Sequence, residues 1–404
     1  MRKEELSRLC KISNGFAFKS DDYVGFGYRV MRITNVQKGA VLDNDPKFVS
    51  DEIADRANNF KLKAGDILIS LTGNVGRVGR IQPEHLPAVL NQRVGLIRPV
   101  SDEINDQYLF QYLNSNKFER EAIQNSNGVA QLNLSSKWIE QYELPLPPID
   151  DQKRIAHLLG KVEGLIAQRK QHLQHLDDLL KSVFLEMFGD PVRNEKGWKI
   201  EPLGKLASIE RGRFSPRPRN DPKFFNGQYP FIQTGDISRS NGRLREFTQT
   251  LNDLGIKVSK EFDIGTIVIA IVGATIGETA ILEIPTYAPD SVIGITPRSG
   301  EITEAVFIEF LLRFWKPVLR ARAPEAARAN INIETLRPLQ VIRPETEDRQ
   351  KFAAIVEKVE SLKSRYQKSL TDLENLYGAL SQQAFKGKLD LSQVPLPLDN
   401  EAER

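Results

Sequence analysis

The chain has 404 residues, of which 27% are charged and 40% hydrophobic, a globular composition with room for two or more domains. Its net charge of +3 does not by itself indicate a nucleic-acid binder. A single cysteine excludes an internal disulfide framework and a cysteine zinc cluster. No apolar run is long enough for a signal peptide or a membrane helix. We therefore expect a cytoplasmic protein without a membrane span.

The two halves of the chain repeat each other. "LSRLCKISNG" at 6–15 matches "LGKLASIERG" at 203–212, an offset of 197 residues. The offset widens to 201 between Tyr28 and Tyr229 and returns to 197 where "KVEGL" at 161 meets "KVESL" at 358. Ordered matches of this kind indicate one duplicated unit whose ends kept their lengths while its internal loops diverged.

Each repeat begins with a strand-rich part. Short β-branched runs, "GDILISL" and "VGLIRP" in the first repeat and "TIVIAIVG" and "VIGITP" in the second, are separated by glycine and proline turns. Each part also contains one amphipathic helical pattern, "INDQYLFQYL" and "ITEAVFIEFLL". We therefore predict two α+β domains, at residues 1–148 and 191–345.

Each repeat ends in a long helical pattern, which we predict at 149–190 and at 346–390, before a tail at 391–404. The first pattern starts directly after Pro147 and Pro148, which cannot lie inside a helix. Apolar residues then recur at alternating steps of three and four, as a coiled-coil seam requires. We expect an antiparallel helix pair, roughly 60 Å long, that separates the two domains with pseudo-two-fold symmetry.

The motifs of catalysis are missing from the sequence. An adenine methyltransferase would need an Asn/Asp-Pro-Pro-aromatic loop, and "DPKF" at Asp45 and at Asp221 lacks the second proline. There is no phosphate loop of the G-x-x-x-x-G-K-[ST] type, and "TGNVGRVG" at 72–79 is better explained as a glycine turn after a strand. The four histidines are not spaced as metal ligands. We expect neither a catalytic nor a metal site.

Basic residues concentrate in the second repeat. Between Lys205 and Arg245, nine lysines and arginines face three acidic residues, a local excess of +6. The segment "ERGRFSPRPRND" at 210–221 suits a loop along a phosphate backbone, because its prolines limit the entropy lost when the arginines bind. Arg320 and Arg322, with Arg328, form a second basic cluster. Phosphate contacts would supply salt-dependent affinity, while specificity needs contacts to base edges.

Candidate DNA contacts are therefore amide, hydroxyl, aromatic and basic side chains on loops beside the strands. Amides can read adenine and arginines can read guanine through paired hydrogen bonds. For each residue taken singly, a structural role in its own loop stays open. Asn133 and Asn332 match between the repeats, and we expect both to be structural. The candidates are Lys19, Ser20, Tyr23, Asn74, Arg77, Asn91, Gln92 and Arg93 in the first repeat, and Arg211, Arg213, Arg217, Arg219, Gln233, Arg239, Asn241, Arg243, Arg320 and Arg322 in the second.

Four segments resemble the DNA-specificity subunits of type I restriction–modification systems. "LPLPPIDDQKRIAHLL" at 144–159 is similar to the family's proline-rich entry into its conserved helix, and "FLEMFGDPVRNEKGWKIEPLG" at 184–204 to its central linker. "SNGFAFKSDDY" at 13–23 resembles the opening of its recognition domains, and "LSQQAFKGKLD" at 380–390 its ending. The second junction, "IRPETEDRQ", departs from the double proline of the first.

The resemblance implies two target-recognition domains that each read half of a bipartite, asymmetric duplex DNA site. It further implies that the long helices dock adenine methyltransferase subunits, two in number, and that a motor-endonuclease subunit joins the complex. The chain itself would carry no chemistry and no cofactor, whereas its partners would use S-adenosylmethionine, ATP and Mg²⁺. Three alternatives stay open: an adaptor of a methylation-only complex, a coiled-coil scaffold that binds only protein, and a stand-alone nuclease. The target bases cannot be read from the sequence.

Overall fold

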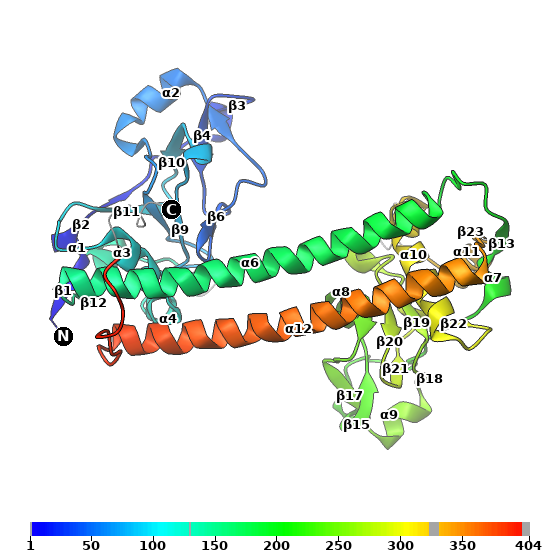
Figure 1. Cartoon of the computed structure of the whole chain (residues 1–404). Coiled ribbons are helices and arrows are strands. Elements are labelled where there is room, and N and C mark those ends of the chain that lie inside the picture. The colour runs from blue at the N-terminus through cyan, green and yellow to red at the C-terminus, as the bar shows by residue number, and fades with distance from the viewer. Residues whose placement is uncertain (1, 129–130, 323–330, 398–404) are drawn as a thin grey trace. The chain divides into compact units, whose positions relative to one another are not determined.

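The computed structural model describes residues 2–128, 131–322 and 331–397. The chain forms two compact units (Figure 1). Unit 1 comprises residues 1–170 together with 368–404, and unit 2 comprises residues 171–367. Each unit therefore contains the β-rich part of one repeat and portions of both long helices.

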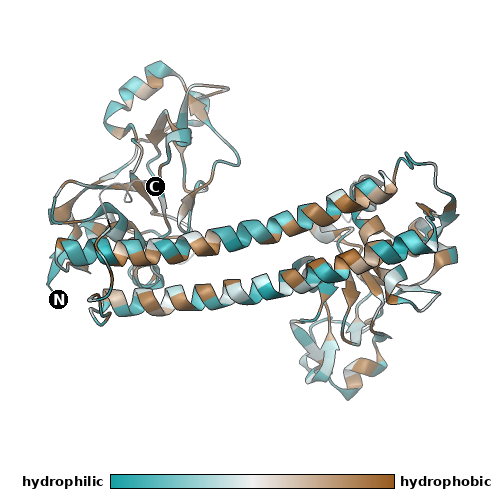
Figure 2. Cartoon of the chain, in the orientation of Figure 1, coloured by the Kyte–Doolittle hydropathy of each residue, from teal (hydrophilic) through white to brown (hydrophobic). Residues whose placement is uncertain are grey.

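The two long helices, α6 (Ile149–Phe188) and α12 (Thr346–Phe385), have 40 residues each. Acidic residues occupy the first turn of both, where the helix dipole favours negative charge. A glycine with positive φ follows each helix, Gly189 at 72° and Gly387 at 67°, a conformation that closes helices. Figure 2 shows hydrophobic residues recurring along both helices between hydrophilic ones, as the predicted seam requires.

The long helices run antiparallel inside each unit. In unit 1, Tyr377 of α12 donates a hydrogen bond to Glu163 of α6 over 2.7 Å. In unit 2, the Nζ atom of Lys363 in α12 lies 2.8 Å from a carboxylate oxygen of Asp177 in α6. Lys170 also pairs with Glu374 in unit 1, and the ring of Phe184 lies against that of Phe352 in unit 2. Within each unit the residue number falls along α12 as it rises along α6, so the predicted antiparallel pairing is present in both.

The β-rich part of unit 1 is built on two four-stranded sheets. The first has the order β2-β11-β8-β9 and the second β10-β4-β7-β3, while β1 pairs with β12 and β5 with β6. The elements are β1 (Lys3–Glu5), α1 (Leu6–Leu9), β2 (Cys10–Asn14), η1 (Ser20–Asp22), β3 (Tyr23–Val24), β4 (Tyr28–Met31), β5 (Val36–Gln37), β6 (Ala40–Val41), β7 (Phe48–Val49), α2 (Asp51–Arg56), η2 (Asn58–Phe60), β8 (Ile67–Ser70), β9 (Val78–Arg80), η3 (Pro83–His85), β10 (Ala88–Leu90), β11 (Val94–Pro99), α3 (Asp106–Leu113), α4 (Asn116–Gln124), α5 (Ser136–Glu140) and β12 (Glu143–Pro145).

Unit 2 repeats this plan with a fifth strand in its first sheet, and its described residues contain no counterpart of the β5–β6 pair. Its sheets have the orders β14-β22-β19-β20-β16 and β17-β15-β21-β18, and β13 pairs with β23. The elements are β13 (Ile200–Pro202), α7 (Leu203–Leu206), β14 (Ala207–Arg211), η4 (Pro222–Phe224), β15 (Phe225–Phe231), α8 (Thr234–Arg239), β16 (Arg243–Leu244), β17 (Gln249–Leu251), α9 (Asp253–Lys257), β18 (Lys260–Phe262), β19 (Ile267–Ala270), η5 (Gly273–Thr275), β20 (Thr279–Leu282), β21 (Thr286–Ala288), β22 (Val292–Pro297), α10 (Ile302–Arg322), α11 (Ile333–Leu336) and β23 (Gln340–Ile342).

The predicted duplication and its α+β character are confirmed. Strands β2-β11-β8-β9 correspond in order to β14-β22-β19-β20, and α6 and α12 begin 197 residues apart. One detail of the sequence alignment is wrong. Asn332 caps α11, accepting a hydrogen bond from the amide of Thr335 at 2.9 Å, so its expected structural role is confirmed. The residue that caps the corresponding helix α5 is Ser135, not Asn133.

The last turns of each long helix lie in a hydrophobic core. In unit 2, Phe184 and Phe188 of α6 are fully buried with Phe307 of α10 and Phe352 of α12. The ring centroid of Phe184 is 5.3 Å from that of Phe352. In unit 1, Phe385 at the end of α12 lies 5.0 Å, ring to ring, from Tyr112. Both cores therefore use aromatic rings from helices that enter from the other half of the sequence.

Cys10 lies in the core of unit 1, at the start of β2. Burial raises the pKa of its thiol to about 12, so the thiol stays protonated at neutral pH. In the part of the chain that the structure describes, no helix is both long and apolar enough to cross a membrane.

The aromatic core of unit 2 yields a stability prediction. Phe184→Ala should lower the free energy of unfolding by about 3–5 kcal/mol, because the ring is 0% exposed and its removal leaves a cavity. The neighbouring Leu185→Ala is the matched control, since Leu185 is 37% exposed, and it should change stability by less than about 0.5 kcal/mol. Urea unfolding of the two variants checks this. Equal effects would show that Phe184 does not hold the core together.

Candidate nucleic-acid interface

Three loops of unit 1 meet at one edge of its first sheet. Strands β2 and β8 both end there, and β11 begins there, because Asn14 pairs with Gly95 and Ser70 pairs with Val94. The segments 15–22, 71–77 and 91–93, which follow or precede these strand ends, are therefore neighbours. We call them together the loop edge of unit 1.

Unit 2 has the corresponding loop edge. Arg211 at the end of β14 pairs with Ile293, and Ala270 at the end of β19 pairs with Val292. The adjoining segments are 212–221, 271–278 and 289–291. Helix α8 packs against β19 and η5 and so borders this edge. Most of the residues predicted to contact DNA are on these two loop edges.

A glycine shapes both loop edges and explains one match between the repeats. A Cβ atom on Gly15 would lie 2.4 Å from the carbonyl oxygen of Leu90, and one on Gly212 would lie 2.2 Å from that of Pro289. Any larger residue would push the segment after β2 or β14 away from the neighbouring turn. The repeat therefore keeps glycine at both positions, and the loops beyond are free to differ.

The predicted residues of the first repeat are on the loop edge of unit 1, with one in the adjoining strand. Lys19, Ser20, Asn74, Gln92 and Arg93 are exposed. Arg77 donates a hydrogen bond to Gln37 over 2.9 Å, and Asn91 accepts one from the backbone of Arg93 over 3.2 Å. Tyr23 begins β3 and packs against the apolar cluster that contains Val49. Arg77, Asn91 and Tyr23 thus also have structural contacts.

Other arginines of the first repeat are structural. The guanidinium of Arg98 donates to both carboxylate oxygens of Asp66, over 2.7 and 2.5 Å. Asp66 is buried, and its hydrogen bonding raises the pKa of Arg98. Arg80 donates to Gln107 and lies over the ring of Phe110, with its Cζ atom 4.7 Å from the ring centroid.

Arginines gather around one carboxylate at the loop edge of unit 2. The Nη2 atom of Arg219 lies 2.7 Å from Oδ2 of Asp290, and that of Arg217 lies 3.9 Å from the same oxygen. Arg211 donates to the backbone carbonyl of Asp290 over 2.6 Å, and Arg213 to that of Ser259 over 3.0 Å. All four arginines are exposed, so they combine an anchored position with access to solvent.

Asp290 was missed by sequence reasoning. It occupies the turn between β21 and β22, where its single acidic charge appeared unremarkable among apolar strands. The turn between β10 and β11 is its counterpart, because the amide of Val94 bonds to the carbonyl of Asn91 just as that of Val292 bonds to Pro289. Matching the turns by these hydrogen bonds makes Asp290 the equivalent of Gln92. Gln92 is one of the residues that the sequence predicted to contact DNA.

The same loop carries a local acid–base pair. Lys223 lies 2.9 Å from a carboxylate oxygen of Asp221, and this hydrogen bond lowers the pKa of Asp221. The carboxylate of Asp221 also accepts from the backbone amide of Lys223, at the start of η4. These contacts fix the end of the arginine-rich segment.

Three further predicted residues are on or next to α8. The amide of Gln233, just before the helix, donates to Gln249 over 3.1 Å. Arg239 donates to the buried carboxylate of Asp236 over 2.6 Å. Asn241 is exposed and has a φ of 49°. Strand β15 pairs in parallel with β21, so Gln233 follows β15 on the side where the turn at 289–291 begins.

Arg320 supports the loop edge of unit 2 from α10. It donates to the carbonyl oxygens of Ile276 and Ala274, over 2.9 and 2.7 Å, and so fixes the loop after β19. Arg322 is the last residue of α10. The side chain of Arg322 and the whole of Arg328 lie outside the described residues.

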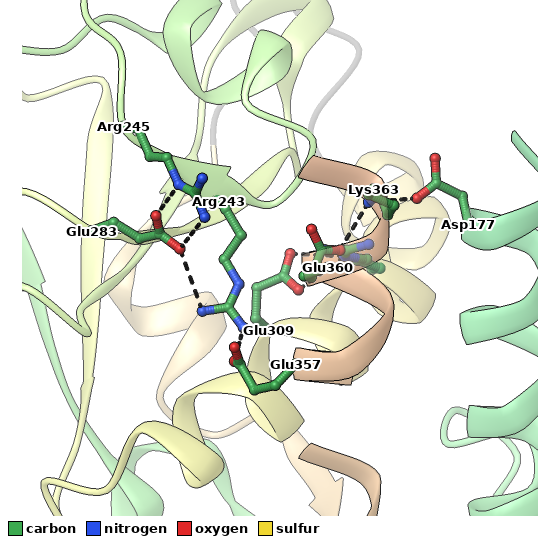
Figure 3. Close-up of polar contacts among 9 residues, drawn as sticks. Asp177, Arg243, Arg245, Glu283, Glu309, Glu357, Glu360 and Lys363 are labelled. Atoms are coloured by element: carbon green, nitrogen blue, oxygen red, sulfur yellow. Dashed lines mark hydrogen bonds and ion pairs between the residues drawn. The ribbon is translucent and has the colours of Figure 1, made fainter. Parts of the chain in front are cut away.

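Arg243 is engaged elsewhere (Figure 3). Its guanidinium is only 11% exposed and lies 2.5 Å from Glu357 of α12 and 3.8 Å from Glu283. Glu283 also pairs with Arg245, and this hydrogen bond raises the pKa of Arg245. The ion pairs join β16 to the long helix, and they leave Arg243 little surface for DNA. We therefore leave Arg243 out of the proposed contact set.

The family model for the type I restriction modification DNA specificity domain matches this chain twice, at residues 2–176 and 195–375. The chain belongs to this family. The two matches correspond to the two repeats, and each includes a loop edge.

Named relatives agree with this assignment. The specificity subunit of the EcoBI type I restriction enzyme of Escherichia coli is 25% identical over 95% of this chain and 85% of its own length. That of the MjaVIII enzyme of Methanocaldococcus jannaschii is 26% identical over 44% of this chain and 43% of its own length. A solved S subunit of a type I system from M. genitalium has the same fold, with a TM-score of 0.56, 15% identity and coverage of 95% of this chain and 96% of that one.

Membership of the family decides whether the chain serves DNA specificity and whether it is catalytic. Specificity subunits determine DNA specificity within type I systems and assemble with the other subunits, and they are themselves non-catalytic. The expectation of a non-catalytic DNA-specificity subunit is therefore confirmed. A protein scaffold without DNA binding is not favoured.

The contacts of Arg243 yield a prediction. Arg243→Ala should destabilise unit 2 by about 1–2 kcal/mol, because Glu357 and Glu283 lose a largely buried, hydrogen-bonded partner. It should leave the salt dependence of DNA binding unchanged. Urea unfolding and DNA titrations at several salt concentrations measure both effects. Unchanged stability with a flatter salt dependence would instead make Arg243 a phosphate contact.

Proposed function

We propose that each unit reads one half of a bipartite, asymmetric site in duplex DNA through its loop edge. The observation that carries this proposal is that the same scaffold presents different side chains at the two loop edges. The strands, the glycine and the turn geometry are the same in both units, whereas the exposed side chains differ. Unit 1 offers mainly amides and hydroxyls around Gln92, and unit 2 offers arginines around Asp290. Two readers with equal frames and unequal side chains suit two unlike half-sites.

The proposed contact set follows the loop edges. Arginine and lysine supply attraction to phosphates, while amides and planar guanidinium groups can distinguish bases. Tyr23 and Arg322 belong to the set by their position in the chain only. The set consists of Lys19, Ser20, Tyr23, Asn74, Arg77, Asn91, Gln92 and Arg93 in unit 1, and Arg211, Arg213, Arg217, Arg219, Gln233, Arg239, Asn241, Arg320 and Arg322 in unit 2.

Two equivalent leucines support two equivalent protein partners. Leu179 on α6 and Leu376 on α12 occupy the same position of the repeated helix, and each is 47% exposed. One exposed leucine is ordinary, but the same exposed position on both helices is what two copies of one partner would need. We assign these partners as adenine methyltransferase subunits that use S-adenosylmethionine, joined by a motor-endonuclease that uses ATP and Mg²⁺, in the cytoplasm.

A methylation-only complex is the alternative that the sequence left open, and the relatives, which are named as subunits of type I restriction enzymes, do not favour it. The two candidates differ only in the presence of the motor-endonuclease. Cleavage of unmodified DNA by the assembled complex, dependent on ATP and Mg²⁺, would separate them.

Selection from a randomised duplex pool tests the proposed function. The full chain, bound to its methyltransferase partner, should retain DNA with two short, unlike motifs at a constant gap. A constant gap would follow from α6 and α12, each of which continues from one unit into the other. A single motif, or no enrichment at low salt, would refute recognition by two readers.

Lys19 provides a test of the loop edge itself. Lys19→Ala should weaken binding to all sequences alike and reduce the slope of log K against log salt by about 0.9, the effect of one lost phosphate contact. Lys63→Ala is the matched control. Lys63 is also exposed, but it precedes β8 and so lies at the opposite end of that strand. If both variants behave alike, the loop edge of unit 1 is not where DNA binds.

A further inference from the structure

The turn at 289–291 differs chemically from its counterpart in unit 1. At the middle position of the turn, unit 1 has Gln92 and unit 2 has Asp290. A carboxylate repels the phosphates of DNA, so Asp290 is an unexpected residue in a segment that the proposed function places against DNA. Its surroundings suggest what it does there.

Asp290 faces the arginine-rich segment at 211–219. Its Oδ2 atom lies 2.7 Å from Nη2 of Arg219, and its side chain is 33% exposed. Its backbone carbonyl accepts from Arg211 over 2.6 Å, which fixes the turn against β14. Its Oδ1 atom is covered and has no hydrogen-bond partner among the described residues. The turn is thus fixed through its backbone, and the carboxylate is directed at the arginines through Oδ2.

The two arginines near Asp290 have different tasks. The Nη1 atom of Arg217 donates to the carbonyl oxygens of Phe214, Ser215 and Pro216, over 3.3, 3.4 and 2.7 Å. Arg217 therefore fastens its own loop. Among the described residues, the side chain of Arg219 hydrogen-bonds to Asp290, and it is 52% exposed. One side of its guanidinium is held, and other donors remain available.

This arrangement favours orientation over charge. An arginine that binds phosphate draws much of its affinity from its positive charge, which a neighbouring carboxylate offsets. An arginine that reads guanine needs a fixed planar fork, so that two N–H groups meet O6 and N7 together. Pairing with a carboxylate reduces the net positive charge and fixes the orientation of the guanidinium, which favours base reading over phosphate binding.

We propose that Arg219 reads a guanine in the half-site of unit 2 and that Asp290 is the positioning residue that orients it. The inference rests on the proposed function and adds a base, a reading residue and a supporting residue to it. Asp290 acts through Arg219 and does not itself touch the base. Gln92, at the equivalent position in unit 1, is directly available to DNA and lacks this device.

The test is selection from a randomised duplex pool with the full chain and its methyltransferase partner, repeated for four variants. In the wild type, one position of one motif should be guanine. Asp290→Asn should lower the preference for guanine at that position about tenfold, within the range of one bidentate pair, and leave the other motif unchanged. Arg219→Lys should do the same although it keeps the charge. Arg219→Ala should remove the preference.

Asp55→Asn is the matched control for Asp290→Asn. Asp55 is an exposed acid whose carboxylate lies 2.8 Å from the ammonium of Lys61, and its replacement changes the net charge equally. It should alter neither motif. Thermal unfolding of each variant verifies that it is folded before its motif is compared.

Each outcome is decisive. Loss of guanine at one position in both Asp290→Asn and Arg219→Lys supports the proposal. Tighter binding by Asp290→Asn to all sequences with unchanged motifs would make Asp290 a mere charge offset and overturn it. An unchanged motif in Arg219→Ala with weaker binding throughout would make Arg219 a phosphate contact and overturn it. Absence of a bipartite motif in the wild type is a different result, because it refutes the proposed function itself.

Discussion

Completion of each hydrophobic core by a helix from the other repeat is the constraint on which the rest of the structure depends. The core of unit 2 includes Phe184 and Phe188, which end the helix of the first repeat. The core of unit 1 includes Ala384 and Phe385, which end the helix of the second. Neither β-rich part has a complete core with its own repeat alone. The long helices are therefore integral parts of both folds rather than linkers between them.

This constraint determines which parts of each repeat can change in sequence and length and which cannot. The ends of each repeat keep their spacing, because the helix, the first strand and the last strand all pack in the shared cores. The loop edges give those cores only a few residues, Leu71 and Val75 in unit 1 and Ile271 and Ile276 in unit 2, and the backbone is restricted where it passes a turn, at Gly15 and Gly212. Beyond these glycines each loop keeps an aromatic anchor, Phe18 in unit 1 and Phe214 in unit 2, and the exposed residues that follow could diverge, into an arginine-rich segment in unit 2 and a shorter one in unit 1. Specificity can thus change while assembly is preserved.

Much of the fold was predictable because its signals are local. Proline before a helix, glycine after it and a regular apolar spacing need no knowledge of distant residues. The duplication was visible because the packing of the ends tolerates little change. Even there the loops misled, since Ser135 and not Asn133 corresponds to Asn332.

The candidate site was less predictable, because which arginines are available depends on distant partners. Arg243 looks like its neighbours in sequence, yet its partner Glu357 is 114 residues away on a long helix. Arg219 and Asp290 are 71 residues apart and meet only because β14, β21 and β22 converge. A count of basic residues identifies the right region. Only the folded structure shows which arginines are paired with carboxylates, which are buried and which are exposed.

The two units also differ in how they lie along the chain. Unit 2 is one continuous segment, 171–367, whereas unit 1 needs residues 368–404 to join its first 170. During synthesis from the N-terminus, the second unit can therefore close before the first, even though the first is made earlier. The core of unit 1 stays incomplete until Phe385 has left the ribosome. A chain truncated between residues 367 and 385 would contain all of unit 2 but an incomplete core in unit 1. Such a truncation should therefore impair unit 1 and not unit 2.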